Sequence, residues 1–370
     1  MKRLCIYLIY DKENIVDKYI GYILKELKNC VTYLIVVYNG KEIQYGKEHL
    51  EYADEIFFRE NKGYDAGGYK DALCSYIGWN TVFKYDELIL LNDSFFGPIY
   101  PIENIFNCIK NINVDFWGIT RHPAGKQNGI DLKSHIQSYF ICFRQNVIQS
   151  KEFFDFWNFM VYPETFQKAV DDFELKLNEV LEQAGFLGTT LMELCNFPVL
   201  VKENENPYLL YSLELIRDGK IPFFKRKSLD FRNQGYNNAL SALKYVEKEN
   251  RYMGECIKQH FRRKSKIEKG MLNYEELERF YHKYQKIYIY GAGCFGQNLS
   301  SYFEYKGWKY ENFLVTKKET QESCLQFEQA RISSEDGIII ALGTKTACMD
   351  IVNYIGNRCS KQQLFLPNYD

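Results

Sequence analysis

The stretch EIFFRENKGYDAGGYKDAL, residues 55–73, decides the fold class. It opens with a short apolar run at residues 55–58, which is typical of a buried strand. Three glycines follow within six residues, and a helix-like run extends from about residue 69 to residue 77. Glycine lets the backbone turn sharply, or lets another group approach it closely. A strand, a glycine-rich loop and a helix in this order indicate an α/β unit.

The flanking sequence repeats this alternation of strands and helices. Further strands are predicted at residues 3–10, 31–38, 87–91, 115–120 and 137–143, and helices at residues 15–29 and 166–185. Strands that alternate with helices at this spacing indicate a mostly parallel sheet flanked by helices. We expect this first α/β domain to span residues 1–240.

The remaining chain contains two segments with different sequence patterns. Residues 241–285 are helical and strongly charged, without a clear strand, and they are predicted to be a helical linker. The segment KIYIYGAGCFGQNL, residues 286–299, starts a new strand, turn and helix, and residues 337–343 supply another apolar strand. These patterns predict a second, smaller α/β domain of Rossmann-like type over residues 286–370.

Composition restricts the class of protein. The 370 residues carry a net charge of -1, which gives no general attraction to nucleic acid or to membranes. The 11 cysteines include no Cys-x-x-Cys pair, and this favours a reducing cytoplasm over a disulfide framework or a zinc cluster. No apolar run approaches the ~18 residues that a membrane span requires. A soluble or peripheral globular protein is expected.

The glycine loop and the segment Asn92-Asp93-Ser94 each follow a predicted parallel strand. Ligands of open parallel sheets bind at the carboxyl ends of the strands. Glycines there would let a nucleotide diphosphate approach the backbone, and Asp93 could hold a divalent cation against it. A tight turn followed by an Asp that caps a helix would explain the same residues. Spacing alone does not choose between these interpretations.

Several unusual motifs occur in a fixed order along the first two-thirds of the chain. They are NKGYDAGGYKDAL, LILLNDSFFGPIYP, FWGIT, HIQSYFICFRQNVIQSKEFFDFW and NPYLLYSLELIRDGKIPFFKRKSL, within residues 61–73, 88–101, 116–120, 135–157 and 206–229. Together they resemble the rhamnan synthesis protein F family, which are bacterial glycosyltransferases of surface-polysaccharide assembly. The resemblance implies a GT-A-like fold and a nucleotide-sugar donor, by analogy dTDP-L-rhamnose. It also implies a lipid-linked glycan acceptor, so that the protein works in the cytoplasm at the inner face of the cell membrane.

The resemblance also assigns residues to the donor site. The donor loop would consist of Asn61, Gly63, Asp65, Gly67 and Gly68. The segment Asn92, Asp93 and Ser94 would replace the usual Asp-x-Asp motif.

Only one residue of Asn92-Asp93-Ser94 is acidic. This segment therefore offers only one carboxylate ligand to Mg²⁺ or Mn²⁺. If Asp93 binds a metal, that metal would neutralise charge on the leaving diphosphate. Without a metal, Lys225 and Arg226 could do this work, although they also fit a solvated basic turn.

An inverting transferase needs a carboxylate that accepts the proton of the acceptor hydroxyl. The segment VDDFELKL offers Asp171, Asp172 and Glu174, of which Glu174 is our first choice and Asp172 the second. The same acids would suit the start of a helix for structural reasons. His135 could touch the acceptor or the diphosphate, or be an ordinary surface residue.

The second glycine motif, Gly291, Gly293 and Gly296, follows a strand and opens a helix, as a dinucleotide site requires. Such a site also needs an acid at the end of the next strand. That strand ends in Thr316-Lys317-Lys318, with Glu319 only beyond it. NAD is therefore not expected, and this domain could bind a nucleotide or only pack against a partner.

The segment IKQHFRRKSKIEKG, residues 257–270, carries six Lys or Arg against one Glu. Such a patch could attract anionic lipid at about 1 kcal/mol per basic residue. A charged linker would have the same composition. For the whole chain, a non-catalytic nucleotide-binding scaffold of a polysaccharide-assembly complex is the alternative to a transferase.

Overall fold

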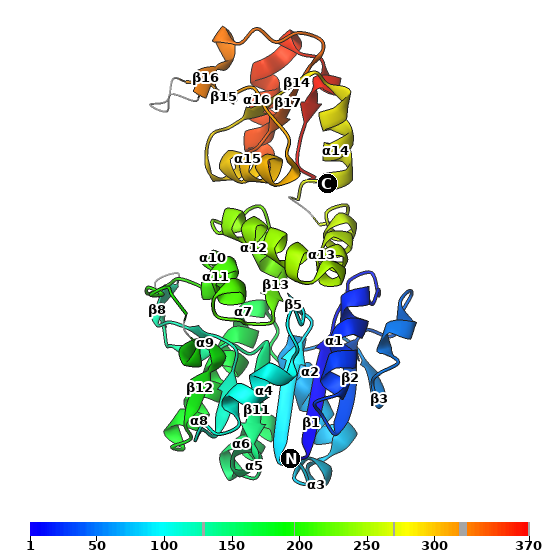
Figure 1. The fold of residues 1–370 in the computed structure, drawn as a ribbon, viewed down its shortest axis with the longest axis vertical. Helices are drawn as coiled ribbons and strands as arrows, with labels where there is room; N and C mark the ends of the chain where they lie inside the picture. The colour runs from blue at the N-terminus through cyan, green and yellow to red at the C-terminus, as the bar shows by residue number, and fades with distance from the viewer. Residues whose placement is uncertain (128–129, 196, 269–270, 318–323, 369–370) are drawn as a thin grey trace. The chain divides into compact units, whose positions relative to one another are not determined.

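A computed structural model describes residues 1–127, 130–195, 197–268, 271–317 and 324–368. The chain divides into two compact units, Met1–Lys227 and Ser228–Asp370, called here the N-terminal and the C-terminal unit (Figure 1). Among the described residues, no helix is long and apolar enough to cross a membrane.

A seven-stranded sheet organises the N-terminal unit. Its order is β12-β6-β11-β4-β1-β2-β3, and β11 alone runs antiparallel to its neighbours. The strands are β1 (Arg3–Ile9), β2 (Tyr33–Asn39), β3 (Glu55–Arg59), β4 (Glu87–Asn92), β6 (Phe116–Gly118), β11 (Phe140–Arg144) and β12 (Gly188–Thr190). The predicted mostly parallel α/β fold is confirmed, with β11 as the exception.

Helices and short strand pairs surround this sheet. The helices are α1 (Lys18–Lys28), α2 (Tyr64–Asp71), α3 (Trp79–Val82), α4 (Glu103–Ile109), α5 (Gln145–Ile148), α6 (Lys151–Phe159), α7 (Phe166–Ala169), α8 (Lys176–Gln183), α9 (Leu191–Leu194), α10 (Pro207–Leu210) and α11 (Ser212–Arg217). Single 3-10 turns are η1 (Lys47–Leu50) and η4 (Arg226–Leu229), and π-helical turns are η2 (Ala72–Ile77) and η3 (Val170–Leu175). The short pairs are β5 (Phe95–Phe96) with β13 (Phe224–Lys225), β7 (Arg121–His122) with β10 (His135–Ile136), and β8 (Gly125–Gln127) with β9 (Ile130–Leu132).

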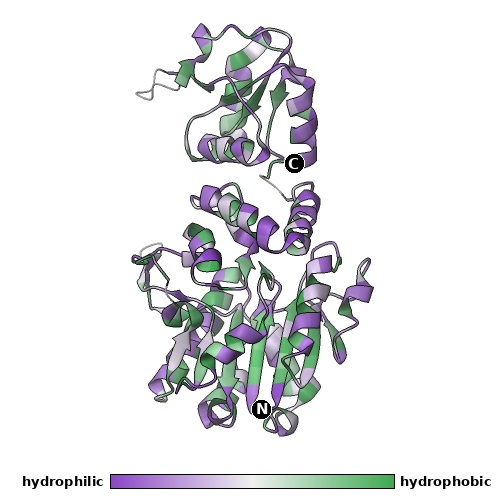
Figure 2. Cartoon of the chain, in the orientation of Figure 1, coloured by the Kyte–Doolittle hydropathy of each residue, from purple (hydrophilic) through white to green (hydrophobic). Residues whose placement is uncertain are grey.

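Both faces of the central strands are covered. Side chains alternate along a strand, so Leu4, Ile6 and Leu8 of β1 share one face. That face packs in one apolar core with residues of α2, α6 and α8. Tyr7, on the opposite face, is also fully buried, as is Tyr19 of α1. Figure 2 accordingly colours these central strands mainly as hydrophobic.

Helix α2 begins at Tyr64, so the predicted loop over residues 61–68 with a helix from about residue 69 was wrong. Gly63 makes the turn with a φ of 77°. Gly67 and Gly68 lie inside the helix, where space rather than flexibility explains them. A Cβ on Gly67 would lie 2.2 Å from the Lys62 carbonyl oxygen, and one on Gly68 would lie 2.1 Å from Leu8.

Buried Arg59, the last residue of β3, anchors the turn before α2. Its guanidinium donates to the Lys62 carbonyl oxygen at 2.6 Å, to Asn39 at 2.6 Å and to Asp71 at 2.7 Å. These bonds join the ends of β2 and β3 to α2, because an arginine fork can satisfy several acceptors at once. The first turn of α2 is thereby held at the carboxyl edge of the sheet.

The C-terminal unit starts with helices and ends in a second sheet. The helices are α12 (Tyr236–Glu249), α13 (Arg251–Lys264), α14 (Tyr274–Lys283), α15 (Cys294–Lys306) and α16 (Lys345–Ile355), with 3-10 turns η5 (Phe327–Gln329), η6 (Gly356–Arg358) and η7 (Lys361–Gln363). The strands are β14 (Lys286–Tyr290), β15 (Phe313–Val315), β16 (Cys324–Gln326), β17 (Asp336–Ile340) and β18 (Leu364–Phe365). All neighbours in the order β16-β15-β14-β17-β18 are parallel. Residues 228–285 group with this sheet, and the predicted division at residues 240 and 285 stays a prediction.

Candidate active site

A cavity of about 340 Å³ opens in the N-terminal unit. This volume lies in the range of about 300–1,000 Å³ that is usual for small-molecule sites. Its walls come from the first turn of α2, the end of β4, the β10–β11 connection, α7 with η3, and β13. The lining residues are Tyr64, Asp65, Asn92, Ser94, His122, Leu132, His135, Gln137, Ser138, Tyr139, Phe166, Ala169, Val170, Phe173, Glu174, Asn206, Leu209, Lys225 and Lys227.

Asp65 and Asn92 meet at the carboxyl edge of the sheet, as expected for two segments that each follow a parallel strand. The Asn92 side-chain amide donates to Asp65 Oδ2 at 2.6 Å. Burial raises the pKa of the Asp65 carboxyl to about 6, and the negative charge of Asp93 adds to this effect. A carboxylate needs stronger stabilisation than one amide donor to keep its ordinary pKa in such a place.

Glu174 also lines the cavity, but its oxygens are occupied. Glu174 Oε1 lies 3.0 Å from His135 Nε2, and Oε2 accepts from the Ser138 backbone at 2.7 Å and from the Ser138 hydroxyl. Burial alone would raise the pKa of Glu174, but these partners outweigh it and lower the pKa to about 2. The same contact raises the pKa of His135. Glu174 therefore holds the β10–β11 connection as an ionised partner.

Lys225 brings a positive charge to the cavity. Its ammonium donates to the Ser94 hydroxyl at 2.8 Å and lies 4.5 Å from the centre of the Tyr139 ring. Burial lowers the pKa of Lys225 to about 8, against the raising effect of Glu174 and Asp65. A half-buried ammonium in the wall of a cavity is suited to binding an anion such as a phosphate.

Asp93 does not line the cavity, because its side chain pairs with Arg226. Its Oδ2 accepts from Arg226 Nη1 at 3.0 Å, and the same nitrogen donates to the Asp93 carbonyl oxygen at 2.7 Å and to the Tyr19 hydroxyl at 2.9 Å. Burial raises the pKa of Asp93, whereas Arg226 lowers it, with a net rise. Asp93 and Arg226 thus form a nearly buried ion pair that fixes the end of β4 to β13.

This ion pair makes Asp93 a poor ligand for Mg²⁺ or Mn²⁺. A divalent cation at Asp93 would meet the fixed positive charge of Arg226. Within the described ranges, no group of three His, Cys, Asp or Glu side chains is placed to hold a metal. The residues therefore do not fit a metal at Asp93, and metal dependence itself stays a prediction.

Other predicted site residues lie outside the cavity wall. Asn61, Asp171 and Asp172 are exposed and do not line it. Gly63, Gly67 and Gly68 are buried under neighbouring side chains and backbone. Their assignment to donor binding, and that of Asp172 to proton transfer, stays a prediction that the geometry of the cavity does not support directly.

The sequence argument missed several wall residues. Ser138 and Tyr139 stand three and four residues after His135 in HIQSYF, so that motif already contained them. Tyr64 and Phe166 are 37% and 66% exposed, and their rings form an edge-to-face pair with centres 6.5 Å apart. No spacing rule would have joined them, because about a hundred residues of chain separate them.

The second glycine motif forms the expected turn between β14 and α15. Gly291 has a φ of 106°, and a Cβ on Gly296 would lie 1.9 Å from the Gly291 carbonyl oxygen. These two glycines are therefore required by the turn itself. Lys318 and Glu319 lie outside the described residues, and nucleotide binding here stays a prediction.

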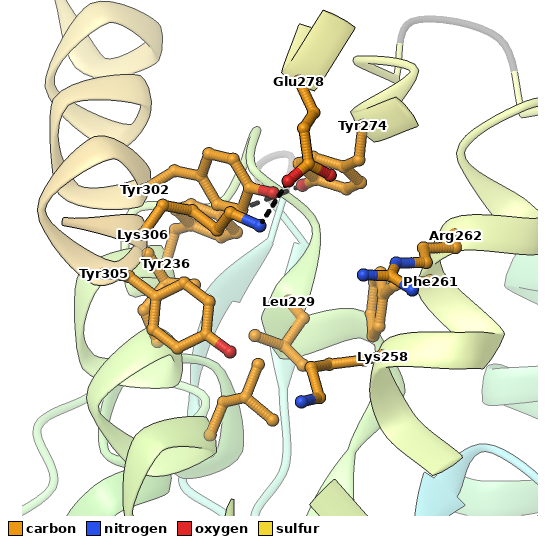
Figure 3. Close-up of a pocket in the computed structure, with 12 residues that line it drawn as sticks. Leu229, Tyr236, Lys258, Phe261, Arg262, Tyr274, Glu278, Tyr302, Tyr305 and Lys306 are labelled. Carbon is orange, nitrogen blue, oxygen red and sulfur yellow. Dashed lines mark hydrogen bonds and ion pairs between the residues drawn. The ribbon is translucent and has the colours of Figure 1, made fainter. Parts of the chain in front are cut away.

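A second cavity lies within the C-terminal unit, between α12, α13, α14 and α15 (Figure 3). Tyr236, Tyr274 and Tyr302 form much of its wall, and the Tyr236 and Tyr274 hydroxyls are 3.1 Å apart. Lys306, at the edge, pairs with Glu278 at 3.3 Å. Its volume of about 90 Å³ is below the usual range for ligand sites. It is better explained as a gap between tyrosine-rich helices.

The predicted basic segment lies mainly on α13. Lys258 pairs with Glu247 and Glu255, each at 3.1 Å, and Lys266 pairs with Glu275 at 2.9 Å. Lys264 is buried, and residues 269–270 lie outside the described part of the chain. Acids thus neutralise part of this charge, and contact with a membrane stays a prediction.

The N-terminal unit is thus of the α/β class, with a ligand-sized cavity at the edge of a mostly parallel sheet. The family described as rhamnan synthesis protein F matches residues 34–292. This match covers more than half of the 370 residues, and the chain belongs to that family. The description of this family names rhamnan synthesis, which is the biosynthesis of a polysaccharide.

Two individual proteins match this chain at low sequence identity. The chain is 25% identical to protein y4gN of Sinorhizobium fredii (strain NBRC 101917 / NGR234) over 184 residues, which is 50% of this chain and 46% of that protein. It thus matches less than half the length of this relative. It is 25% identical to virulence protein VirA of Vibrio anguillarum (strain ATCC 68554 / 775) over 282 residues, which is 69% of this chain and 88% of that protein.

A solved structure, that of 4-diphosphocytidyl-2C-methyl-D-erythritol synthase, matches 51% of this chain and 89% of its own chain with a TM-score of 0.34 and 12% identity. Similarity at this level carries no functional conclusion.

Proposed function

We propose that this protein is a glycosyltransferase of the GT-A type. It transfers a sugar, in the first instance L-rhamnose from dTDP-L-rhamnose, to a lipid-linked cell-surface polysaccharide. The observation that supports this is the cavity in which Asp65, Asn92, Glu174 and Lys225 converge. Family membership supports the proposed reaction class. The identities proposed for the donor and the acceptor rest only on the resemblance of the sequence motifs.

Lys225 has the chemistry that the leaving group requires. Departure of a nucleoside diphosphate concentrates negative charge on its oxygens, and a preorganised cation stabilises that charge. Lys225 is held toward the cavity by Ser94 and Tyr139. Arg226, the next residue, pairs with Asp93 and does not line the cavity. We assign charge neutralisation to Lys225 and the positioning of β4 and β13 to the Asp93–Arg226 pair.

Donor binding should weaken in alkaline solution. The groups that face Lys225 are Glu174, Asp65, Arg226 and Lys227, and burial outweighs the two acids to lower its pKa to about 8. Lys225 is therefore charged below about pH 8 and neutral above it. Between pH 7 and pH 9, the Kd of a nucleotide sugar should rise up to about tenfold.

Isothermal titration at several pH values measures this effect. Lys225→Arg is the matched variant, because a guanidinium keeps its charge throughout this range. Its Kd should stay flat with pH. A flat profile for the wild type as well would contradict the assignment of the diphosphate to Lys225.

A ligand screen tests the function itself. Thermal unfolding is followed with dTDP-, UDP- and GDP-sugars, and with NAD(H), each with and without Mn²⁺. We expect stabilisation by a nucleotide sugar in either condition, and none by NAD(H). A protein that no nucleotide sugar stabilises would instead fit the scaffold alternative.

For the C-terminal unit we propose only a general role. We assign it to the Rossmann-like type, as a module that binds a nucleotide or packs against a partner of the assembly machinery. Its five parallel strands and the turn at Gly291 support the type. Peripheral contact with the inner membrane surface would bring the lipid-linked acceptor to the N-terminal unit.

A further inference from the structure

The two carboxylates of the cavity differ in what their oxygens can still accept. Glu174 uses both oxygens on His135 and Ser138. Asp65 uses Oδ2 on Asn92, and in the described part of the chain Oδ1 receives no hydrogen bond. A general base must have a free lone pair within reach of the reacting hydroxyl. Asp65 meets this requirement with a whole oxygen. Glu174 keeps one lone pair on Oε1, but His135 and Ser138 lower its pKa to about 2, which makes it a weak base.

Asn92 orients the Asp65 carboxylate. Its amide donates to Asp65 Oδ2, while its Oδ1 accepts from the Ser94 backbone at 3.1 Å. Asn92 is itself fixed as the last residue of β4, next to Leu8 of β1. Both ends of the amide are thus occupied, so Asp65 Oδ2 is held, while Oδ1 receives no hydrogen bond from the described residues.

Exposed aromatic rings stand beside Asp65 at the cavity. Tyr64, the preceding residue, has a φ of 53°, a backbone conformation that costs a non-glycine residue about 1–2 kcal/mol. It pairs edge to face with Phe166 on α7. Both residues line the cavity and are partly exposed. Flat rings of this kind suit the apolar face of a sugar ring, and they would place an acceptor sugar next to Asp65.

We propose that Asp65 is the general base of the transfer, with Asn92 as its positioning residue and Tyr64 and Phe166 as the platform for the acceptor sugar. This inference rests on the proposed function. The acceptor oxygen forms a bond with the anomeric carbon of the donor, and the bond from that carbon to the diphosphate oxygen breaks. The proton of the acceptor hydroxyl moves to Asp65 Oδ1. The bonding electron pair leaves with the nucleoside diphosphate, whose charge Lys225 faces.

The charges around Asp65 suit this role. The charged groups near it are Asp93 just after β4, Glu174 of η3 and Lys225 of β13. Burial, together with the Asp93 charge, raises the pKa of Asp65 to about 6. A base works best when its pKa lies near the working pH. Asp65 is ionised above about pH 6, so transfer should rise with pH through about 6 and be lost below it.

The test compares Asp65→Asn with Glu174→Gln, two matched changes that remove one carboxylate charge each. Transfer by Asp65→Asn should fall about 10²–10⁴-fold, and its Kd for the nucleotide sugar should stay within about threefold of the wild type. The wild type and Glu174→Gln should both show the acidic limb near pH 6 in kcat/KM. The residual rate of Asp65→Asn should lack it.

Three outcomes separate the possibilities. If Asp65→Asn binds donor but transfers at more than about a third of the wild-type rate, Asp65 is not the base. If the wild type has no acidic limb near pH 6, or if Glu174→Gln loses that limb, the assignment is also overturned. If the wild type transfers no nucleotide sugar at all, the proposed function fails, and the assignment fails with it.

Discussion

Replacing Lys225 with Met should lower transfer by about 10²–10³-fold, the loss seen when one preorganised donor to a developing oxyanion is removed. Lys225 faces the cavity with its ammonium 2.8 Å from the Ser94 hydroxyl, and methionine has nearly its length without the charge. Because the charge on the leaving diphosphate is greatest in the transition state, kcat should fall more than donor affinity. Steady-state kinetics with the purified protein measure both.

Lys133→Met is the control for that experiment. The Lys133 side chain is 76% exposed, pairs with Glu179 and is not among the residues that line the cavity. Its loss should leave kcat unchanged. Equal kcat values for Lys225→Met and the wild type would remove Lys225 from the reaction.

Replacing Arg226 with Met should destabilise the N-terminal unit by about 3 kcal/mol, the low end of the range for breaking a buried ion pair. The low end applies because the Arg226 side chain keeps 27% exposure, against 12% for Asp93. The loss leaves the Asp93 carboxylate buried without its partner, and the Tyr19 hydroxyl also loses a donor. Urea unfolding measures the free energy of unfolding.

Two further variants control this stability prediction. Lys151→Met breaks an exposed pair with Asp155, and it should cost at most about 1 kcal/mol. The double variant Arg226→Met with Asp93→Asn should be more stable than Arg226→Met alone, since no charge is then left buried. If Arg226→Met is no less stable than Lys151→Met, the pair does not hold β4 to β13.

Local patterns were sufficient to predict six of the seven strands of the sheet, but not the short edge strand β12. The apolar runs of β1, β2 and β4 are buried on both faces, and such strands read directly as short hydrophobic segments. The stripe of α1 was equally clear, since Tyr19, Ile20, Ile23, Leu24 and Leu27 are its buried residues. The antiparallel direction of β11 could not be read in this way, because strand direction depends on pairing and not on side-chain period.

Glycine was the ambiguous signal. In NKGYDAGGYKDAL the three glycines have two different causes, and the sequence does not distinguish them. Gly63 makes a left-handed turn, whereas Gly67 and Gly68 allow close packing on Lys62 and Leu8. The latter contact depends on where α2 sits on β1, which no local pattern contains.

The candidate site was predictable as an edge of the sheet, but not as a set of contacts. The predicted strand ends at residues 58 and 91 located it. Pairs such as Asp93 with Arg226, 133 positions apart, and Glu174 with His135, 39 positions apart, depend on the folded chain. These pairs change the chemistry: they commit Asp93 and Glu174 to structural partners and leave Asp65 and Lys225 for a ligand.

The central claim is that the cavity of the N-terminal unit binds the nucleotide sugar. Isothermal titration of a nucleotide sugar into Ala169→Trp tests this most directly, because Ala169 lines the cavity and an indole there would fill it. Ala184→Trp is the matched control, at an exposed position beyond the cavity wall. The account predicts wild-type affinity for Ala184→Trp and at least about tenfold weaker binding for Ala169→Trp, a loss of about 1.4 kcal/mol or more. Equal affinities for the two variants would contradict it.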